Sequence, residues 1–301
     1  MKNITVIGDY ITLNEDQKAR LAAIGNVSYV ATPEGGSIEW LEAVQGADII
    51  CSDGDYLYEN LDNLKNVFAL YPYIELGNFN SEKLAEKGVY VANTQGSNKN
   101  SIAEWAMFSM LSLFRKFYPA VNTEIEIPLT FNESLEDKKV LIAGKGSIGT
   151  RIGELCEVFG MKVDFLNRGD DLLEKSKDAD VVVNALNVNS TSKNLLDEEF
   201  FMALKKGAYF VSFARQHTFD LGGAVKSLDA GILGGAAFDC DPEKPGGVDN
   251  EFYQAGLRHE KILATPHIAF ATTKAKANGA EFLVQNVENY LAGKCENIIE
   301  K

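Results

Sequence analysis

The sequence predicts an α/β protein with two doubly wound parallel sheets, each covered by helices on both faces. Three observations lead to this prediction. Ten short runs rich in β-branched residues alternate with helical segments, and alternation at this spacing is typical of parallel sheets. A long apolar helix divides these runs into two sets, and a glycine-rich turn follows the first strand of the second set.

The first set of strands is expected at NITVIG, ADIIC, NVFAL and GVYVAN. The next segment, Ser101 to Phe117, is apolar around most of its helical surface, which indicates burial between two domains or subunits. Residues 118–139 are polar and rich in turn formers, so they read as a connection to a second domain that begins near Val140.

The second set of strands is expected at KKVLIAG, MKVDFL, ADVVVNAL, GAYFVSF, GILGGAAFD and KILATPHI. The closing segment, Thr272 to Leu291, has helical periodicity and could pack against either domain.

Composition and charge exclude several classes of protein. The chain has 301 residues, 46% of them hydrophobic, and a net charge of -14, so nucleic acid and anionic membranes are poor partners. No signal-like segment opens the chain, and no stretch approaches the roughly 18 apolar residues of a membrane span. We therefore expect a cytoplasmic protein. Four cysteines without a CxxC pair predict reduced thiols and no metal site.

The strongest local motif is G-x-G-x-x-G, formed by Gly144, Gly146 and Gly149 between a strand and a helix. Gly144 would make the tight turn, Gly146 would let the backbone approach a pyrophosphate, and Gly149 would allow close packing of helix on strand. This context predicts a dinucleotide site.

The next strand ends in Asn167 and Arg168 instead of the usual acid. A carboxylate there would bind the ribose 2'-hydroxyl and repel a 2'-phosphate, whereas an amide beside a guanidinium accepts the phosphate. NADP is therefore favoured over NAD. The alternative is that Arg168 stacks on adenine or points to solvent while Asn167 still binds the ribose.

Candidate catalytic side chains follow three strands. His267 comes after ILATP, where a general acid or base would be placed, and Arg215 and His217 come after VSFA. His259 lies in the charged segment GLRHEK and is expected to be solvated.

The third strand end, AAFDCDPEKP, brings Asp239, Asp241, Glu243 and Lys244 within six positions. Acidic side chains at the carboxyl end of a strand are typical of catalytic sites in α/β enzymes.

The order of these motifs resembles the D-isomer-specific 2-hydroxyacid dehydrogenases, a family that includes formate, glycerate and phosphoglycerate dehydrogenases. The match covers most of the chain from about Leu76 to Thr273. The stretches that carry it are KGVYVANTQGSNKNSIAEWA, the glycine motif, LNVNSTSKNLLDEEFFMALKKGAYFVSFAR, GGAAFDCDPEKP and TPHIAFAT. The resemblance implies a Rossmann NAD(P)-binding domain, residues 98–276, inserted into a flavodoxin-like substrate domain of residues 1–97 and 277–301. It also implies an active site in the cleft between the domains and a homodimer built on the nucleotide domains.

Position by position, the resemblance places Arg215 on the substrate's carboxylate and carbonyl, His267 on the acid/base role and Asp239 on the nicotinamide carboxamide. These assignments suit the chemistry, because reduction of a 2-oxo acid needs a hydride, a proton and a fixed cation for the carboxylate. Further cofactor contacts are implied at Ser147, Ile148, Asn187, Phe213 and Ala214.

The chain departs from the family where a glutamate normally pairs with the histidine. That position, five residues beyond Asp239, is Lys244, and a lysine near His267 would disfavour imidazolium. Glu243 could reach the histidine after a one-residue shift, Lys244 could take an altered role, the site could have lost its chemistry, or both side chains could be solvated. Asp241 is expected to be a bystander.

A second departure lies in the substrate loop, YPYIELGNFN. It retains Asn78 but has Tyr73 and Glu75 where glycines are usual, and Gly77 and Asn80 where acids are usual. A Glu75 that faced the cleft would repel a small anionic acid. The alternative is a repacked loop with Glu75 in solvent.

The leading hypothesis is an NAD(P)-dependent D-2-hydroxyacid dehydrogenase with Arg215, His267 and Glu243 as its catalytic residues. The rival is a dinucleotide-binding sensor or interaction protein on the same fold, with little or no turnover. Arg215 and His267 favour the enzyme, whereas Lys244 and the altered substrate loop favour the rival.

Overall fold

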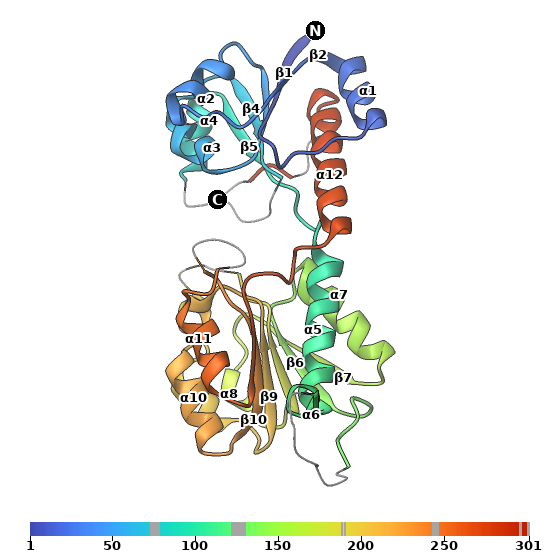
Figure 1. Cartoon of the computed structure of the whole chain (residues 1–301), viewed down its shortest axis with the longest axis vertical. Coiled ribbons are helices and arrows are strands. Elements are labelled where there is room, and N and C mark those ends of the chain that lie inside the picture. Colours follow the sequence, from blue (N-terminus) through green and yellow to red (C-terminus); the bar gives the residue numbers. More distant parts are fainter. Residues whose placement is uncertain are drawn as a thin grey trace. The chain divides into compact units, whose positions relative to one another are not determined.

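A computed structural model describes most of the chain as two units, which are traced in Figure 1. The described residues are 1–72, 79–121, 131–187, 189, 191–242, 247–294 and 297–299. One unit contains Met1–Asn98 and Thr273–Lys301, and the other contains Lys99–Thr272.

The first unit is built on a parallel sheet of the flavodoxin-like order, β2-β1-β3-β4-β5. Its strands are β1 (Lys2–Ile7), β2 (Gly25–Val30), β3 (Ile49–Ser52), β4 (Val67–Leu70) and β5 (Val89–Ala92). Of these strands, β2 was missed from the sequence. It is an edge strand whose side chains are mostly exposed or half-buried, so it lacks the apolar run that marks the others.

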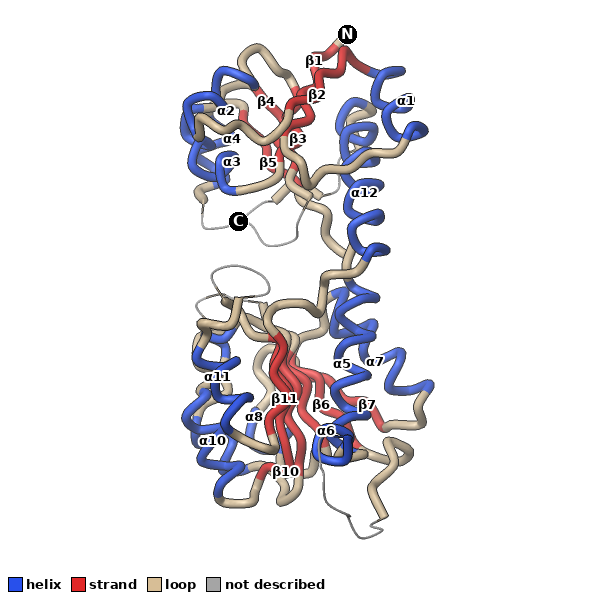
Figure 2. The backbone as a smooth tube through the Cα atoms, in the orientation of Figure 1, coloured by secondary structure: helices blue, strands red, loops and turns tan. Residues whose placement is uncertain are grey.

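Helices cover both faces of this sheet, as Figure 2 shows. They are α1 (Glu15–Ile24) and α12 (Thr273–Leu291) on one face, and α2 (Ser37–Ala43), α3 (Asp55–Asn60) and α4 (Ser81–Glu86), with a 3-10 turn at Leu61–Asn63, on the other. Helix α12 is bound to helix α1, because Arg20 on α1 donates to Glu281 and Glu288 on α12 over 2.7 to 3.0 Å.

The second unit has a six-stranded parallel sheet in the order β11-β10-β9-β8-β6-β7. Its strands are β6 (Lys139–Ala143), β7 (Lys162–Leu166), β8 (Val181–Asn184), β9 (Ala208–Ser212), β10 (Leu233–Asp239) and β11 (Ile262–Thr265). The strand order reverses at β6, because β7 pairs on one side of it and β8 on the other.

This sheet is also covered on both faces (Figure 2). One face carries α5 (Lys99–Phe114), α6 (Phe117–Val121) and α7 (Ser147–Val158), and the other carries α8 (Leu172–Ser176), α9 (Glu198–Ala203), α10 (Leu221–Asp229) and α11 (Glu251–Arg258). A 3-10 turn at Gln216–Thr218 follows β9.

The apolar helix α5 belongs to the second unit, so the expectation from sequence pattern that this domain begins near Val140 is wrong. Met110 and Phe114 of α5 are fully buried in the same cluster as Val140 and Ile142 of β6. The helix therefore covers the sheet that follows it in the chain, and this packing explains why apolar residues occupy so much of its surface.

Candidate active site

The glycine turn between β6 and α7 is shaped for close backbone approach. Gly144 has φ of 111°, and a Cβ there would lie 2.4 Å from the carbonyl oxygen of Ala185 at the end of β8. A Cβ on Gly149 would lie 2.0 Å from the carbonyl oxygen of Gly144. Only glycine fits at either position without moving the backbone.

Gly146 differs from these two glycines because a Cβ built on it would meet nothing within 4 Å. It is the N-cap of α7, a helix of 12 residues, and Ser147 and Ile148 form its first turn. Open space in front of a helix N-terminus, at the point where strand order reverses, suits a pyrophosphate. The residues present therefore fit a dinucleotide.

The turn after β7 contains an acid, Asp170, to which the sequence pattern did not point. Asn167 and Arg168 are exposed, as a contact with a ribose would require. The backbone N–H of Asn167 donates to the Asp170 carboxylate over 2.8 Å, and its side-chain amide does so over 3.3 Å. Lys175 lies 3.8 Å from the same carboxylate. A negative group thus sits three residues beyond the position where the acid was sought.

The loops after β8 and β9 are tied together by a fully buried amide. Asn184 donates to Ser212 over 3.1 Å and to Thr218 over 2.8 Å. The Thr218 hydroxyl in turn donates to the carbonyl oxygen of Arg215 over 2.8 Å. Arg215 is therefore held from the end of the neighbouring strand.

The predicted cofactor contacts Asn187, Phe213 and Ala214 lie on these same two loops; Asn187 is exposed, and Phe213 and Ala214 are half-buried. The Asn187 carbonyl oxygen accepts from the Ser192 hydroxyl over 2.6 Å, which fixes its loop. Phe213 packs against the core beneath α5 and α7. Their contacts with a cofactor stay predictions.

His267 lies just after β11 in a left-handed backbone conformation, with φ of 57°. A residue with a Cβ adopts this conformation only at a cost, so the surroundings must enforce it. Asp239, at the end of β10, accepts from the Thr265 hydroxyl over 2.6 Å and from the N–H groups of Ile268 and Ala269 over 2.9 and 2.8 Å. The carboxylate thus clamps both sides of the histidine.

Burial raises the pKa of Asp239, while its hydrogen bonds and the nearby His267 oppose that rise. Thr265 extends the network, because its hydroxyl also accepts from the indole N–H of Trp105 on α5 over 3.1 Å. The structure therefore gives Asp239 a structural role in the loop that carries His267. Its predicted contact with the nicotinamide carboxamide stays a prediction.

Asp241 is no bystander, contrary to expectation. Its Oδ1 accepts from Nη1 of Arg215 and lies 3.7 Å from Nδ1 of His267. The two side chains that the sequence singled out as catalytic therefore meet at one carboxylate. Sequence reasoning missed this because it looked for the partner at a fixed spacing before a proline.

Other candidates are resolved only in part. Glu243 and Lys244 lie outside the described residues, as do Tyr73, Glu75, Gly77 and Asn78. Asn80 is described and caps α4, accepting from the N–H of Lys83 over 2.9 Å.

The remaining polar groups near the strand ends offer less to catalysis. His217 is exposed in the 3-10 turn. His259 is not solvated as expected, because its side chain is only 19% exposed and lies 3.5 Å from Asp229. Burial raises the pKa of the Cys240 thiol to about 12, which leaves it un-ionised and unreactive at neutral pH.

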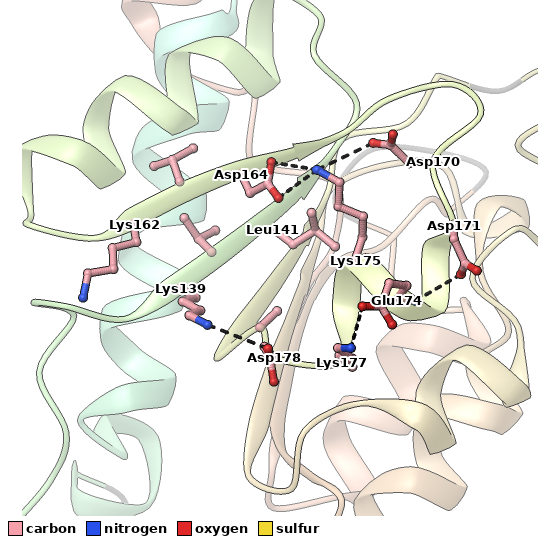
Figure 3. A pocket seen from close by; sticks show the side chains of 13 residues that line it. Lys139, Leu141, Lys162, Asp164, Asp170, Asp171, Glu174, Lys175, Lys177 and Asp178 are labelled. Atoms are coloured by element: carbon pink, nitrogen blue, oxygen red, sulfur yellow. Dashed lines mark hydrogen bonds and ion pairs between the residues drawn. The ribbon is translucent and has the colours of Figure 1, made fainter.

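A hollow of about 590 Å³ opens beside β6, β7 and α8, and its lining includes Asp170 of the turn after β7 (Figure 3). Its charged side chains are largely paired with one another: Lys175 with Asp164 and Asp170, Lys177 with Glu174, and Lys139 with Asp178. This pairing offers no single-sign surface for a charged ligand. Within the described ranges, no helix has the length and apolar character that a membrane crossing requires.

Together, a doubly wound parallel sheet and a glycine turn at its reversal point define a dinucleotide-binding domain. Residues 107–269 match the profile of the D-isomer specific 2-hydroxyacid dehydrogenase, NAD binding domain. The chain belongs to this family of oxidoreductases.

Curated relatives agree with this assignment. The chain is 28% identical to glycerate dehydrogenase of Methylorubrum extorquens over 291 residues, 89% of each chain. It is also 28% identical to D-lactate dehydrogenase of Staphylococcus epidermidis over 230 residues, 66% of this chain and 68% of the relative.

Two solved structures share the fold. An acyclic imino acid reductase in complex with NADPH and D-Arg aligns with a TM-score of 0.83 at 20% identity, over 99% of this chain and 100% of that one. The apo form of D-mandelate dehydrogenase of Rhodotorula graminis gives 0.82 at 18% identity, over 100% and 98%.

The clamp around His267 predicts a matched pair of variants. Thr265→Val removes the hydroxyl that links Trp105 to Asp239, leaving two polar groups without that partner, and should lower the free energy of unfolding of the second unit by about 1–3 kcal/mol. Thr265→Ser retains the hydroxyl and should restore most of the loss. Urea unfolding followed by tryptophan fluorescence measures both, because Trp105 reports the second unit and Trp40 the first. Equal stability of the two variants would contradict the clamp.

Proposed function

We propose that this protein reduces a small 2-oxo acid to the D-2-hydroxy acid with a nicotinamide cofactor, and catalyses the reverse oxidation. The observation that carries the proposal is the convergence of Arg215 and His267 on Asp241 from the ends of two strands. A guanidinium and an imidazole at one point supply the cation and the proton that this reaction needs.

The turn of Gly144, Gly146 and Gly149 would hold the nicotinamide cofactor, which would provide the hydride for C2 of the oxo acid. Arg215 binds the carboxylate through two parallel hydrogen bonds and orients the carbonyl. His267, as imidazolium, donates its proton to the carbonyl oxygen as charge develops there. In the reverse direction, neutral His267 takes the proton from the hydroxyl group.

Glu243 remains our proposed carboxylate in the catalytic set, as the residue nearest in sequence to the family's glutamate position. Asp239 is proposed to reach the nicotinamide carboxamide as well as clamping the loop, since a carboxylate has lone pairs beyond the three hydrogen bonds it already accepts.

The proposed activity is tested with purified protein, NADPH or NADH, and a panel of 2-oxo acids: glyoxylate, hydroxypyruvate and pyruvate. We expect loss of nicotinamide absorbance with at least one acid. His267→Gln should lower kcat about 10²–10⁴-fold because the proton donor is removed, while Arg215→Lys should mainly raise KM because the planar fork is lost. Cofactor binding that persists without turnover of any acid would instead support the sensor hypothesis.

For the cofactor we propose NADP(H) over NAD(H). Arg168 is exposed at the end of β7 beside the neutral Asn167, and a guanidinium there can pair with a 2'-phosphate. Asp170 opposes this preference, since its carboxylate would bind a ribose hydroxyl and repel the phosphate. The choice therefore depends on the balance of two charges in one turn.

The two charges can be separated by mutation. Arg168→Ala should weaken NADPH binding about tenfold and leave NADH binding nearly unchanged, because only the phosphate loses a partner. Asp170→Asn should strengthen NADPH binding. Fluorescence titration with both cofactors measures the effect. A wild-type protein that binds NADH clearly more tightly than NADPH would overturn the preference.

We also propose a homodimer formed through the nucleotide domain. Phe108 on α5 is 53% exposed although most of its helix is buried, and Val158 and Phe159 at the end of α7 are 81% and 44% exposed. A hollow of about 90 Å³, lined in part by Leu111 and Phe159, opens on this face. Exposed apolar side chains on adjacent helices are typical of a subunit interface.

The dimer predicts that Phe108→Lys gives a monomer, because a charge would be buried at the interface. Light scattering after size-exclusion chromatography measures the mass. Ile38→Lys is the control, since Ile38 is 74% exposed on α2 of the other unit and should leave the dimer intact. A wild-type monomer would refute the proposal.

A further inference from the structure

We infer that Asp241 is a positioning residue that aligns Arg215 and His267 for the reaction. The inference rests on the proposed function, in which these two residues bind and protonate the substrate. It assigns a role to a carboxylate two residues beyond Asp239, whereas the family resemblance pointed to a position five residues beyond it.

The loops after β9, β10 and β11 meet at one carboxylate oxygen. Oδ1 of Asp241 accepts from Nη1 of Arg215, which follows β9, and lies 3.7 Å from Nδ1 of His267, which follows β11. Asp241 itself follows β10, between those two strands in the sheet. The side chain of Asp241 is 18% exposed, so solvent screens these charges only in part.

The backbone of Asp241 is also held from two sides. The buried Asn250 donates to the Asp241 carbonyl oxygen over 3.0 Å and to the Gln216 side chain, directly after Arg215, over 2.9 Å. The N–H of Cys240 donates to the Thr265 carbonyl oxygen over 2.8 Å, on the strand that leads to His267. These ties fix the carboxylate relative to both of its partners.

The placement of the charge suits reduction. A carboxylate at ion-pair distance from Nδ1 stabilises imidazolium and orients the ring so that Nε2 can serve as the proton donor. A guanidinium has five N–H donors, so pairing with Asp241 is compatible with a two-point grip on a substrate carboxylate. One side chain thereby aligns the cation and the acid.

Asp239 and Asp241 are charged groups beside His267, and the Arg215 guanidinium shares the Asp241 oxygen with it. Asp239 is committed to the loop by three hydrogen bonds. Asp241, whose Oδ1 lies near both His267 and Arg215, can respond to the charge on His267 and to the position of Arg215.

The first test needs no turnover. Three histidines are present in the chain, so the imidazole signals of labelled protein can be followed by NMR, with His267→Gln identifying the signal of His267. Asp241→Asn should move the titration midpoint of His267 to lower pH by about one unit, because the carboxylate that favours imidazolium is lost. Asp249→Asn, the same change at an exposed position on the same loop, should not move it.

The second test is kinetic. In the direction of 2-oxo acid reduction, Asp241→Asn should lower kcat/KM at least tenfold, raise KM as Arg215 loses its alignment, and shift the alkaline limb of the pH profile to lower pH. Asp241→Glu retains the charge and should recover part of the activity. Cofactor binding close to that of the wild type reports that each variant is folded.

The outcomes separate the two proposals. A His267 midpoint and a pH profile that are both unchanged in Asp241→Asn would refute the role of Asp241, even with an active wild type. If Asp241→Asn shifts the His267 midpoint but the wild-type protein turns over no oxo acid, the coupling of Asp241 to His267 is supported and the proposed reaction is refuted.

Discussion

The site depends on the carboxylate of Asp239. His267 has a backbone conformation that side chains with a Cβ rarely adopt, and the hydrogen bonds from Thr265, Ile268 and Ala269 to Asp239 enforce it. A buried carboxylate is costly unless it is hydrogen-bonded, and here the Thr265 hydroxyl and the N–H groups of Ile268 and Ala269 provide those bonds. The same hydrogen bonds therefore stabilise the buried carboxylate of Asp239 and position His267.

The parallel topology of the sheet places the other candidate site residues near Asp239. β9, β10 and β11 are neighbours in the sheet, so Arg215, Asp241 and His267 emerge side by side although 52 residues separate the first from the last. The neighbouring strands β6 and β8 likewise place Gly144 of the predicted cofactor turn against Ala185. Buried amides connect these strand ends, with Asn184 holding the loop of Arg215 and Asn250 the loop of Asp241.

Two acidic side chains lie close to the predicted cofactor and catalytic residues. Asp170 lies in the turn expected to bind the adenosine ribose, and Asp241 lies close to both Arg215 and His267. Each occurs a few residues from the position where a family pattern would look for an acid. Loops can supply the same charge from different positions, because a hydrogen-bonded turn brings residues two or three apart within reach of one another.

The sequence alone determined the fold class, the family and ten of the described strands, and it singled out Gly144, Arg215 and His267 as candidate site residues. These signals are local: β-branched runs, glycine spacing and side chains directly after strands depend on short-range backbone geometry. The tertiary structure decided that α5 covers the sheet of β6, that the exposed strand β2 pairs at an edge, and that Asp241 meets Arg215 and His267. Those features depend on contacts between segments far apart in the chain, and no local pattern encodes them.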